Sequence, residues 1–291
     1  MKRKQKYTDK VVIVTGASSG IGRATALAFA REGATTILAA RSLETLNQVA
    51  GEIARFGGSA RVIQTDVSDR QQAETLAERV VAEFGKIDVL INNAGSGAVG
   101  MVEDKRFVDD ARHLFEVDFF GKVYCTLAVL PVMRRQGCGA IVNLSSVVGR
   151  KAFPRFGAYS ASMHAVSAFS DALRQELRGS SIHVTTVHPA LTETAFFHGV
   201  DPADMPAPFR YMKPLTPETV ARQIVKAVGK HSSRIVIPWQ PRTLLLSEAF
   251  SAWLGDVMVR LLAKPWFMAM IGMYRAVRQP TAAIEKLAGK E

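Results

Sequence analysis

The stretch Val11-Val12-Ile13-Val14-Thr15-Gly16-Ala17-Ser18-Ser19-Gly20-Ile21-Gly22 lies near the start of the 291-residue chain. Its first five residues are all β-branched, which predicts a buried strand. The glycines that follow allow a tight turn, and a helix opening at Gly20 would present unpaired N–H groups to a phosphate. The stretch therefore predicts a strand-turn-helix unit that binds a dinucleotide. The predicted contacts are Gly16, Ser18, Ser19, Gly20, Ile21 and Gly22.

The rest of the chain alternates short apolar runs with helix-length amphipathic segments. Strands are predicted at Val11–Thr15, Thr35–Ala40, Ala60–Gln64, Asp88–Asn92, Ala140–Leu144, Ile182–Val187 and Arg234–Ile237. Helices are predicted at Gly20–Glu32, Leu43–Phe56, Gln71–Phe84, Asp109–Arg135, Ala158–Arg178 and Thr216–Val228. Continuous apolar strands separated by helices favour a parallel sheet covered on both faces. We therefore expect an α/β fold, a doubly wound Rossmann-type sheet with its ligand crevice at the carboxyl ends of the strands.

The domain organisation follows from this pattern, because no internal repeat or low-complexity linker interrupts it. We expect a basic N-terminal segment at residues 1–9, a single dinucleotide-binding and catalytic domain at 10–242, and a helical, apolar extension at 243–291. The segment Leu191–Pro217 carries five prolines and cannot form one regular helix. It is placed to form a lid over the crevice.

Several motifs occur in a fixed order along this framework. The turn reads Thr-Gly-x-x-x-Gly-x-Gly, Asn92-Asn93-Ala94-Gly95 follows the fourth strand, and Ser146 precedes Tyr159 by thirteen residues. In these motifs the chain resembles the short-chain dehydrogenase/reductase family, from about Lys10 to Ile237. The resemblance implies an oxidoreductase that uses a nicotinamide dinucleotide.

The resemblance also implies further cofactor contacts. Asp66 and Val67 match the positions beside the adenine ring, and Asn93, Ala94 and Gly95 match the segment beside the cofactor. Pro189, Thr192 and Thr194 match the turn against the nicotinamide, with Ala190 where the family has glycine. Tyr159 is expected to contact the cofactor as well.

The end of the second strand selects between the two nicotinamide cofactors. An acidic residue there would bind the ribose hydroxyls of NAD(H) and repel a 2′-phosphate. The strand instead ends Ala39-Ala40-Arg41-Ser42, and Arg41 can pair with a phosphate. We therefore expect NADP(H) as the preferred cofactor, with NAD(H) as the alternative.

The chemistry implied by the family needs a proton donor and a group that holds the substrate oxygen. By resemblance, Tyr159 donates the proton and Ser146 hydrogen-bonds the oxygen. The family has a lysine four residues after the tyrosine, which lowers the tyrosine pKa and binds the nicotinamide ribose, and here that position is Met163. Methionine supplies neither a charge nor a hydrogen-bond donor. His164 should point about 100° away from this position on a helix, so it is not a replacement.

A second departure lies in the long helix. Asp118 stands where the family has an asparagine that takes part in a proton relay, so it should lie near Met163. An ionised Asp118 would lack the family's lysine as a partner and would raise the pKa of a nearby tyrosine. Asp118 could instead be protonated, or act in a different relay.

Three functions are consistent with these motifs. The first is an NADP(H)-dependent oxidoreductase that acts on a carbonyl or alcohol with a modified Ser-Tyr site. The second is a cofactor-binding protein with little or no turnover. The third is a non-redox acid/base reaction in the same pocket, with Tyr159 or Asp118 as the acid or base. The expected partner is a small, apolar carbonyl or alcohol, and we also expect a homo-oligomer.

Composition limits the other classes of partner. The formal charge of +11 is partly local, because Lys2, Arg3, Lys4, Lys6 and Lys10 crowd the start of the chain. No basic patch with interleaved aromatic residues indicates nucleic-acid binding. The two cysteines have no metal-ligand spacing, and we expect no metal site.

The C-terminal extension has an apolar run, Pro265 to Tyr274, flanked by Lys264 and Arg275. This run is too short to span a bilayer. It fits a helix packed over the crevice or against a second subunit, and it also fits a helix at a membrane surface. With no secretory signal visible, we expect a cytoplasmic protein, with membrane association through this extension as an alternative.

Overall fold

A computed structural model describes residues 5–194, 200 and 204–274 of the chain. Lys2, Arg3 and Lys4, parts of the expected lid, and the end of the C-terminal extension lie outside the described residues. The strands are β1 (Val11–Thr15), β2 (Thr35–Ala40), β3 (Ser59–Gln64), β4 (Val89–Asn92), β5 (Gly139–Leu144), β6 (Ile182–Pro189) and β7 (Arg234–Ile237). They form one parallel sheet in the order β3-β2-β1-β4-β5-β6-β7. The strand order reverses between β1 and β4, which places the ligand crevice there.

The helices follow the predicted segments closely. They are α1 (Gly20–Arg31), α2 (Leu43–Arg55), α3 (Arg70–Phe84), α4 (Phe107–Leu114), α5 (Gly121–Gln136), α6 (Gly157–Glu176), α7 (Ala207–Tyr211), α8 (Pro217–Val228), α9 (Pro241–Phe250), α10 (Ala252–Leu262) and α11 (Pro265–Met270). The single long helix predicted at Asp109–Arg135 is divided, because a π-helical turn at Phe115–Phe120 joins α4 to α5. Such wide turns occur often at functional sites.

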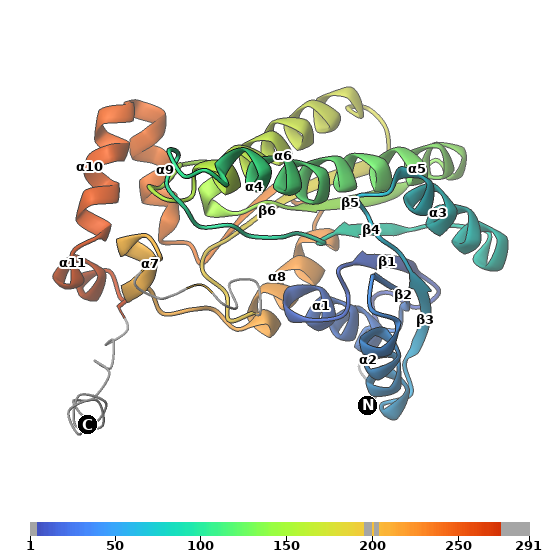
Figure 1. The fold of residues 1–291 in the computed structure, drawn as a ribbon. Coiled ribbons are helices and arrows are strands. Elements are labelled where there is room, and N and C mark those ends of the chain that lie inside the picture. The colour runs from blue at the N-terminus through green and yellow to red at the C-terminus, as the bar shows by residue number, and fades with distance from the viewer. Residues whose placement is uncertain (1–4, 195–199, 201–203, 275–291) are drawn as a thin grey trace, which may run out of the picture.

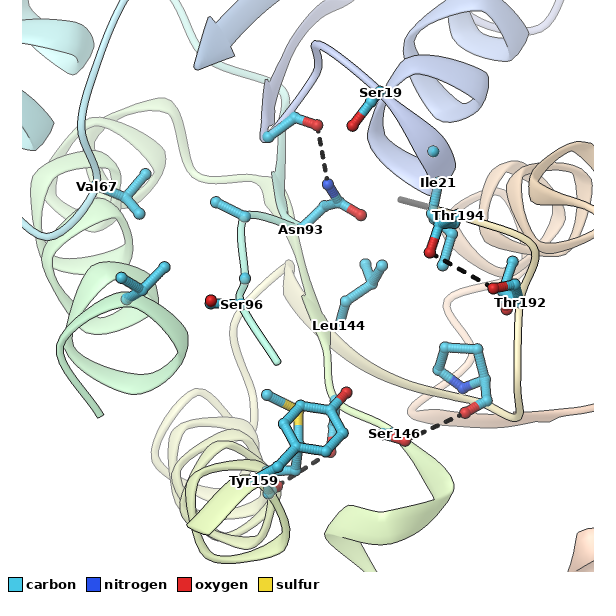
Figure 2. Close-up of a pocket in the computed structure, with 18 of the residues that line it drawn as sticks. Ser19, Ile21, Val67, Asn93, Ser96, Leu144, Ser146, Tyr159, Thr192 and Thr194 are labelled. Carbon is cyan, nitrogen blue, oxygen red and sulfur yellow. Dashed lines mark hydrogen bonds between the residues drawn. The ribbon is translucent and has the colours of Figure 1, made fainter. Parts of the chain in front are cut away.

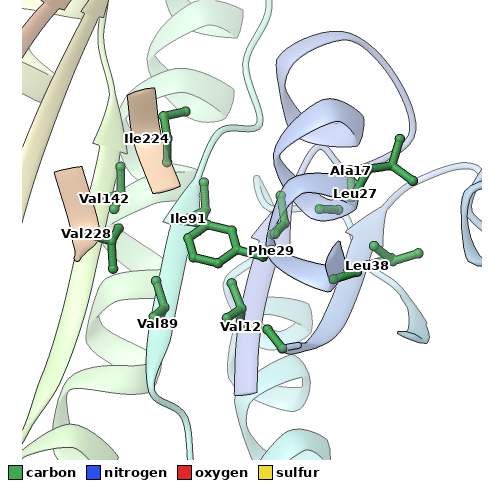
Figure 3. Close-up of a cluster of buried hydrophobic side chains, with 14 of the residues drawn as sticks. Val12, Ala17, Leu27, Phe29, Leu38, Val89, Ile91, Val142, Ile224 and Val228 are labelled. Carbon is green, nitrogen blue, oxygen red and sulfur yellow. The ribbon is translucent and has the colours of Figure 1, made fainter. Parts of the chain in front are cut away.

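The sheet is covered on both faces, as Figure 1 shows, with α1, α2 and α8 on one side and α3, α5 and α6 on the other. The alternation of side chains along β1 explains this arrangement. Val12 and Val14 belong to the core under α1, α2 and α8, whereas Val11 and Ile13 belong to the opposite core. Phe29 of α1 packs among the side chains of the first core (Figure 3). The doubly wound fold expected from the sequence is confirmed.

Helix ends are set by local side-chain caps. The Ser42 hydroxyl accepts a hydrogen bond from the N–H of Thr45 at the start of α2, and Asp69 accepts one from the N–H of Gln72 in α3. These caps fix where each helix leaves the sheet, and hence where the preceding loop passes the crevice.

The helices α9 to α11 pack at one end of the domain (Figure 1). Their buried residues Leu244, Leu262 and Met268 join a third apolar cluster that also contains Tyr159 and Phe209. Lys151, which is nearly buried, lies 2.7 Å from a carboxylate oxygen of Glu248 in α9 and 2.7 Å from one of Asp256 in α10. Apolar packing and these ion pairs therefore hold the extension against the domain.

The described residues contain neither a membrane-spanning helix nor a cluster of metal ligands. Within residues 5–194, 200 and 204–274, no helix combines the length and apolar character that crossing a bilayer requires. The same residues contain no group of three His, Cys, Asp or Glu side chains arranged to hold a metal ion. The domain limits at residues 9 and 242 remain predictions.

Candidate active site

A cavity of about 840 Å³ lies at the carboxyl ends of the central strands. Figure 2 shows side chains from the turn after β1, the loop after β4, the end of β5 and α6 around it. Most residues predicted from the sequence line this cavity: Gly16, Ser18, Ser19, Gly20, Ile21, Arg41, Asp66, Val67, Asn93, Ala94, Gly95, Ser146, Tyr159, Met163, Pro189, Thr192 and Thr194. Gly22 and Asp118 are not among its lining residues.

The turn after β1 and the loop after β4 are held together by Asn93. Its amide nitrogen donates to the backbone oxygens of Thr15 and Gly16, at 2.9 and 3.2 Å. The Thr15 hydroxyl accepts from the N–H groups of Asn93 and Ala94, both at 3.0 Å. These bonds fix the two segments that form the floor of the cavity.

Two glycines are required for this approach. Gly16 has a φ of +63°, and a Cβ there would lie 2.8 Å from the Asn93 amide nitrogen. A Cβ on Gly22 would lie 2.1 Å from the backbone oxygen of Gly16, so Gly22 packs beneath the turn and does not face the cavity. With the N-terminus of α1 opening at Gly20, this backbone cradle fits the pyrophosphate of a dinucleotide.

The far end of the cavity is polar. Arg41 is exposed at the carboxyl end of β2, and its backbone oxygen accepts a hydrogen bond from Gln64 at 2.8 Å. Asp66 uses one carboxylate oxygen within its own turn, accepting from the N–H and the hydroxyl of Ser68 at 3.0 and 2.7 Å. Arg41 therefore lies at the edge of the cavity, and the end of β2 carries no carboxylate.

Ser146 and Tyr159 meet on the opposite side of the cavity. Ser146 follows β5, Tyr159 lies in the first turn of α6, and both side chains are buried (Figure 2). Burial raises the pKa of the Tyr159 hydroxyl, and the charge of Asp118 raises that pKa further. A hydrogen bond with Ser146 lowers the pKa, but by less than these two effects raise it. Tyr159 is therefore a protonated acid near neutral pH.

Met163 occupies the next turn of α6 and is buried. Its backbone oxygen accepts from the hydroxyls of Ser145 and Ser167, at 3.0 and 2.9 Å. His164 is exposed, and its Nδ1 lies 2.7 Å from the backbone oxygen of Ser160 in the same helix. As expected from the sequence, His164 does not replace a lysine at position 163.

Asp118 lies in the π-helical turn and is completely buried. One carboxylate oxygen accepts from the N–H of Ser96 at 2.7 Å, and the other accepts from the hydroxyl of Ser162 at 3.0 Å. Burial raises the pKa of Asp118 to about 6, although Lys122 and these two donors oppose the shift. Asp118 therefore joins the loop after β4 to the turn of α6 that carries Met163.

Lys122 lies one helical turn after Asp118 and is also buried. Its ammonium group donates to the backbone oxygen of Ala94 at 2.8 Å, and the residue lines the cavity. Burial lowers the pKa of Lys122, and the charge of Asp118 opposes that change. An ionised Asp118 lacks a lysine at position 163 as a partner, but Lys122 is a cationic neighbour on its own helix.

Lys122 and Ser96 were missed from the sequence. The signal for Lys122 was its spacing of four residues from Asp118 on a predicted helix, which places two opposite charges on one face. Ser96 contributes only its backbone N–H, so its side chain carried no signal.

Beside Tyr159 the cavity becomes apolar. Phe156 packs edge-on against Tyr159 and Phe209, with ring centres 5.9 and 5.0 Å apart. Val148 and Leu191 complete this wall. The wall suits the apolar part of a small molecule next to the reacting hydroxyl.

Known proteins are similar to this chain in sequence. The family model for the short chain dehydrogenase matches residues 10–204. An uncharacterized oxidoreductase of Mycobacterium tuberculosis is 37% identical over 236 residues, which cover 79% of this chain and 67% of that protein. An uncharacterized oxidoreductase of Staphylococcus saprophyticus is 36% identical over 226 residues, which cover 76% of this chain and 91% of that protein.

A solved structure shows the same fold. An alcohol dehydrogenase from the archaeon Thermococcus sibiricus, complexed with 5-hydroxy-NADP, superposes with a TM-score of 0.68 at 26% identity. The match covers 78% of this chain and 95% of that one. The chain belongs to the short-chain dehydrogenase family. It is an oxidoreductase of this family, built on a nucleotide-binding Rossmann fold that takes a nicotinamide cofactor.

Proposed function

We propose that this protein is an NADP(H)-dependent oxidoreductase that reduces the carbonyl group of a small, apolar substrate. The observation that carries the proposal is the pairing of Ser146 with a protonated Tyr159 at the apolar end of a dinucleotide-sized cavity. The cofactor would supply the hydride. The protein's own groups hold the substrate oxygen and deliver a proton to it.

The roles of the two side chains follow from their environment. The Ser146 hydroxyl can hydrogen-bond the substrate oxygen, and the Tyr159 hydroxyl can donate the proton as negative charge develops there. Because its pKa is raised, Tyr159 keeps its proton at neutral pH. Reduction needs this protonated form, whereas oxidation of an alcohol needs a base. The protonated Tyr159 is thus in the state that carbonyl reduction requires.

The missing lysine changes how the site is held. Asp118 and Lys122 together fix the backbone of Ala94 and Ser96, and Asp118 also holds Ser162 beside Met163. We propose that this pair positions the loop after β4 and α6 relative to each other. Neither group donates a proton to the substrate in this proposal.

The cofactor preference rests on Arg41. Its guanidinium can bind the 2′-phosphate of NADP(H), since the end of β2 offers no carboxylate for the ribose hydroxyls of NAD(H). Arg41→Asp should weaken NADPH binding by at least about tenfold and strengthen NADH binding. Arg55→Asp, on the exposed end of α2, is a matched control that should change neither affinity.

A second candidate function is cofactor binding with little turnover, and Met163 is the observation that favours it. The deciding experiment measures NADPH binding by fluorescence and NADPH consumption with a panel of aldehydes and ketones. Consumption that requires Tyr159 supports the oxidoreductase. Tight binding without consumption of NADPH across the panel would support the second candidate instead.

We also propose that the protein is a cytoplasmic homo-oligomer whose subunits contact one another through α5. Leu127 is exposed on this helix, and Phe120 at its start stacks on Tyr124 with ring centres 6.0 Å apart. An exposed apolar strip of this kind suits a second copy of the chain. Leu127→Asp should reduce the molar mass measured by light scattering after gel filtration, and an unchanged mass would rule this interface out.

A further inference from the structure

The tryptophans of this chain are placed unusually. All three lie between residues 239 and 266, after the last strand of the sheet. Trp239 and Trp253 are each 65% exposed, and Trp266 is 61% exposed. Phe250, the last residue of α9, is 86% exposed. Such large rings are highly buried on average, so four of them open to solvent within one extension indicate a surface that meets a partner.

The helices of the extension are apolar on two sides. On α9, Leu244 is buried against the domain, whereas Leu246 and Phe250 are exposed. On α11, Met268 is buried, whereas Trp266 and Met270 are exposed. Residues four apart lie on the same side of a helix, so the outward side of each helix is apolar as well. The inner sides are covered by the third core, and the outer sides have no cover among the described residues.

In the described part of the extension, the acidic side chains pair with the domain, whereas the basic side chains are exposed. Its two acidic residues in the range 239–274, Glu248 and Asp256, both pair with Lys151 of the domain. Its three basic residues in that range, Arg242, Arg260 and Lys264, are exposed. The exposed apolar side chains are therefore accompanied by cations, while the carboxylates are already engaged.

We propose that these outward side chains form a surface that binds the interface of an anionic phospholipid bilayer. This aromatic surface consists of Trp239, Leu246, Phe250, Trp253, Trp266 and Met270. Tryptophan favours the boundary between headgroups and acyl chains, where its ring is buried and its N–H remains hydrated. Exposed arginine and lysine add attraction to anionic headgroups.

A second copy of the chain is a poorer occupant. A symmetric dimer through this surface would bring identical patches together. Such an interface would contain Arg242, Arg260 and Lys264 of both copies, while Glu248 and Asp256 remain paired with Lys151. The binding is peripheral, because α9 has 10 residues and α10 has 11, too few to cross a bilayer.

The extension that carries this surface packs beside Tyr159. Leu244 and Met268, on the inner side of the extension, belong to the same apolar cluster as Tyr159 and Phe209. Binding at a bilayer would therefore bring the cavity close to membrane-dissolved molecules. This consequence rests on the proposed function, whereas bilayer binding itself does not.

The test is co-sedimentation of the full chain with two kinds of vesicle, one of phosphatidylcholine alone and one of equal parts phosphatidylcholine and phosphatidylserine. We expect binding to the anionic vesicles, weakened by added salt, with a blue shift of tryptophan fluorescence. Trp253→Ser with Trp266→Ser, and separately Arg260→Glu with Lys264→Glu, should each reduce the bound fraction by about tenfold. Val108→Ser is the matched control, since Val108 is exposed on α4, outside the aromatic surface.

NADPH affinity of each variant reports whether it is folded, so a loss of vesicle binding with NADPH affinity retained supports the proposal. Equal sedimentation of wild type and both double variants would overturn it, as would no sedimentation of the wild type with anionic vesicles. Equal binding to both vesicle types would overturn the anionic preference. A lower molar mass of the tryptophan variant, with vesicle binding unchanged, would assign the surface to a second copy.

Discussion

Asp118 and Lys122 are one helical turn apart, both are buried, and they hold neighbouring groups of one loop. Asp118 accepts from the N–H of Ser96 at 2.7 Å, and Lys122 donates to the oxygen of Ala94 at 2.8 Å. Two opposite charges thus occur together close to the turn of α6 that carries Met163.

Removing one charge of the pair should be worse than removing both. Asp118→Asn or Lys122→Met alone leaves an uncompensated buried charge, so each should lower the free energy of unfolding by about 3–5 kcal/mol at pH 8. The double variant, which buries no charge there, should lose much less than the sum. Urea denaturation of the four proteins measures this coupling. Additive losses would show that the two groups do not interact.

The free energy of unfolding should change with pH because Asp118 titrates. Its pKa is about 6 in the folded protein and 3.8 as the reference value, so the folded state binds the extra proton. Stability from this group is therefore complete below about pH 3.8 and is lost as the pH rises through about 6, by about 3 kcal/mol in total.

Urea denaturation between pH 4 and pH 8 measures this slope, with Asp118→Asn/Lys122→Met as the control protein. The difference in unfolding free energy between wild type and control should change with pH in that window, in favour of wild type at the acid end. A constant difference would mean that Asp118 does not titrate there.

Tyr159→Phe should remove carbonyl reduction while leaving cofactor binding almost intact. Loss of a positioned proton donor lowers kcat by about 100- to 10,000-fold. The ring itself, packed against Phe156, remains in place. Tyr124→Phe on α5, which does not line the cavity, is the matched control. Full activity of Tyr159→Phe would exclude this residue as the acid.

Met163→Lys should increase NADPH affinity only when Lys122 is also replaced. A lysine at position 163 would lie beside Ser162, which Asp118 holds at 3.0 Å, and would compete with Lys122 for the same carboxylate. We expect Lys122→Met/Met163→Lys to recover stability relative to Lys122→Met, and to bind NADPH about tenfold more tightly than wild type. Calorimetric NADPH titrations of these proteins provide the comparison. Unchanged NADPH affinity would mean that position 163 does not reach the nicotinamide ribose.

Most of the fold could be predicted from local sequence. Strand β1 and helix α1 follow from five β-branched residues and a glycine turn, and Ser42 and Asp69 mark helix starts through caps formed within three residues. The division of the long helix was not predictable in this way. The π-helical turn at Phe115–Phe120 has no glycine or proline within it, and it accommodates Asp118, whose partners come from distant segments.

The sequence alone determined the doubly wound sheet and the glycine turn after β1, because strand periodicity and glycine turns are local properties of the chain. The Ser146–Tyr159 pair was implied by the resemblance of the ordered motifs to the family. Only the tertiary structure decided that Lys122 lies in the cavity and that the carboxylates of the extension are engaged by Lys151. Burial and charge pairing depend on which segments pack together. The type of a residue does not determine whether its charge or ring is paired inside the protein or exposed at the surface.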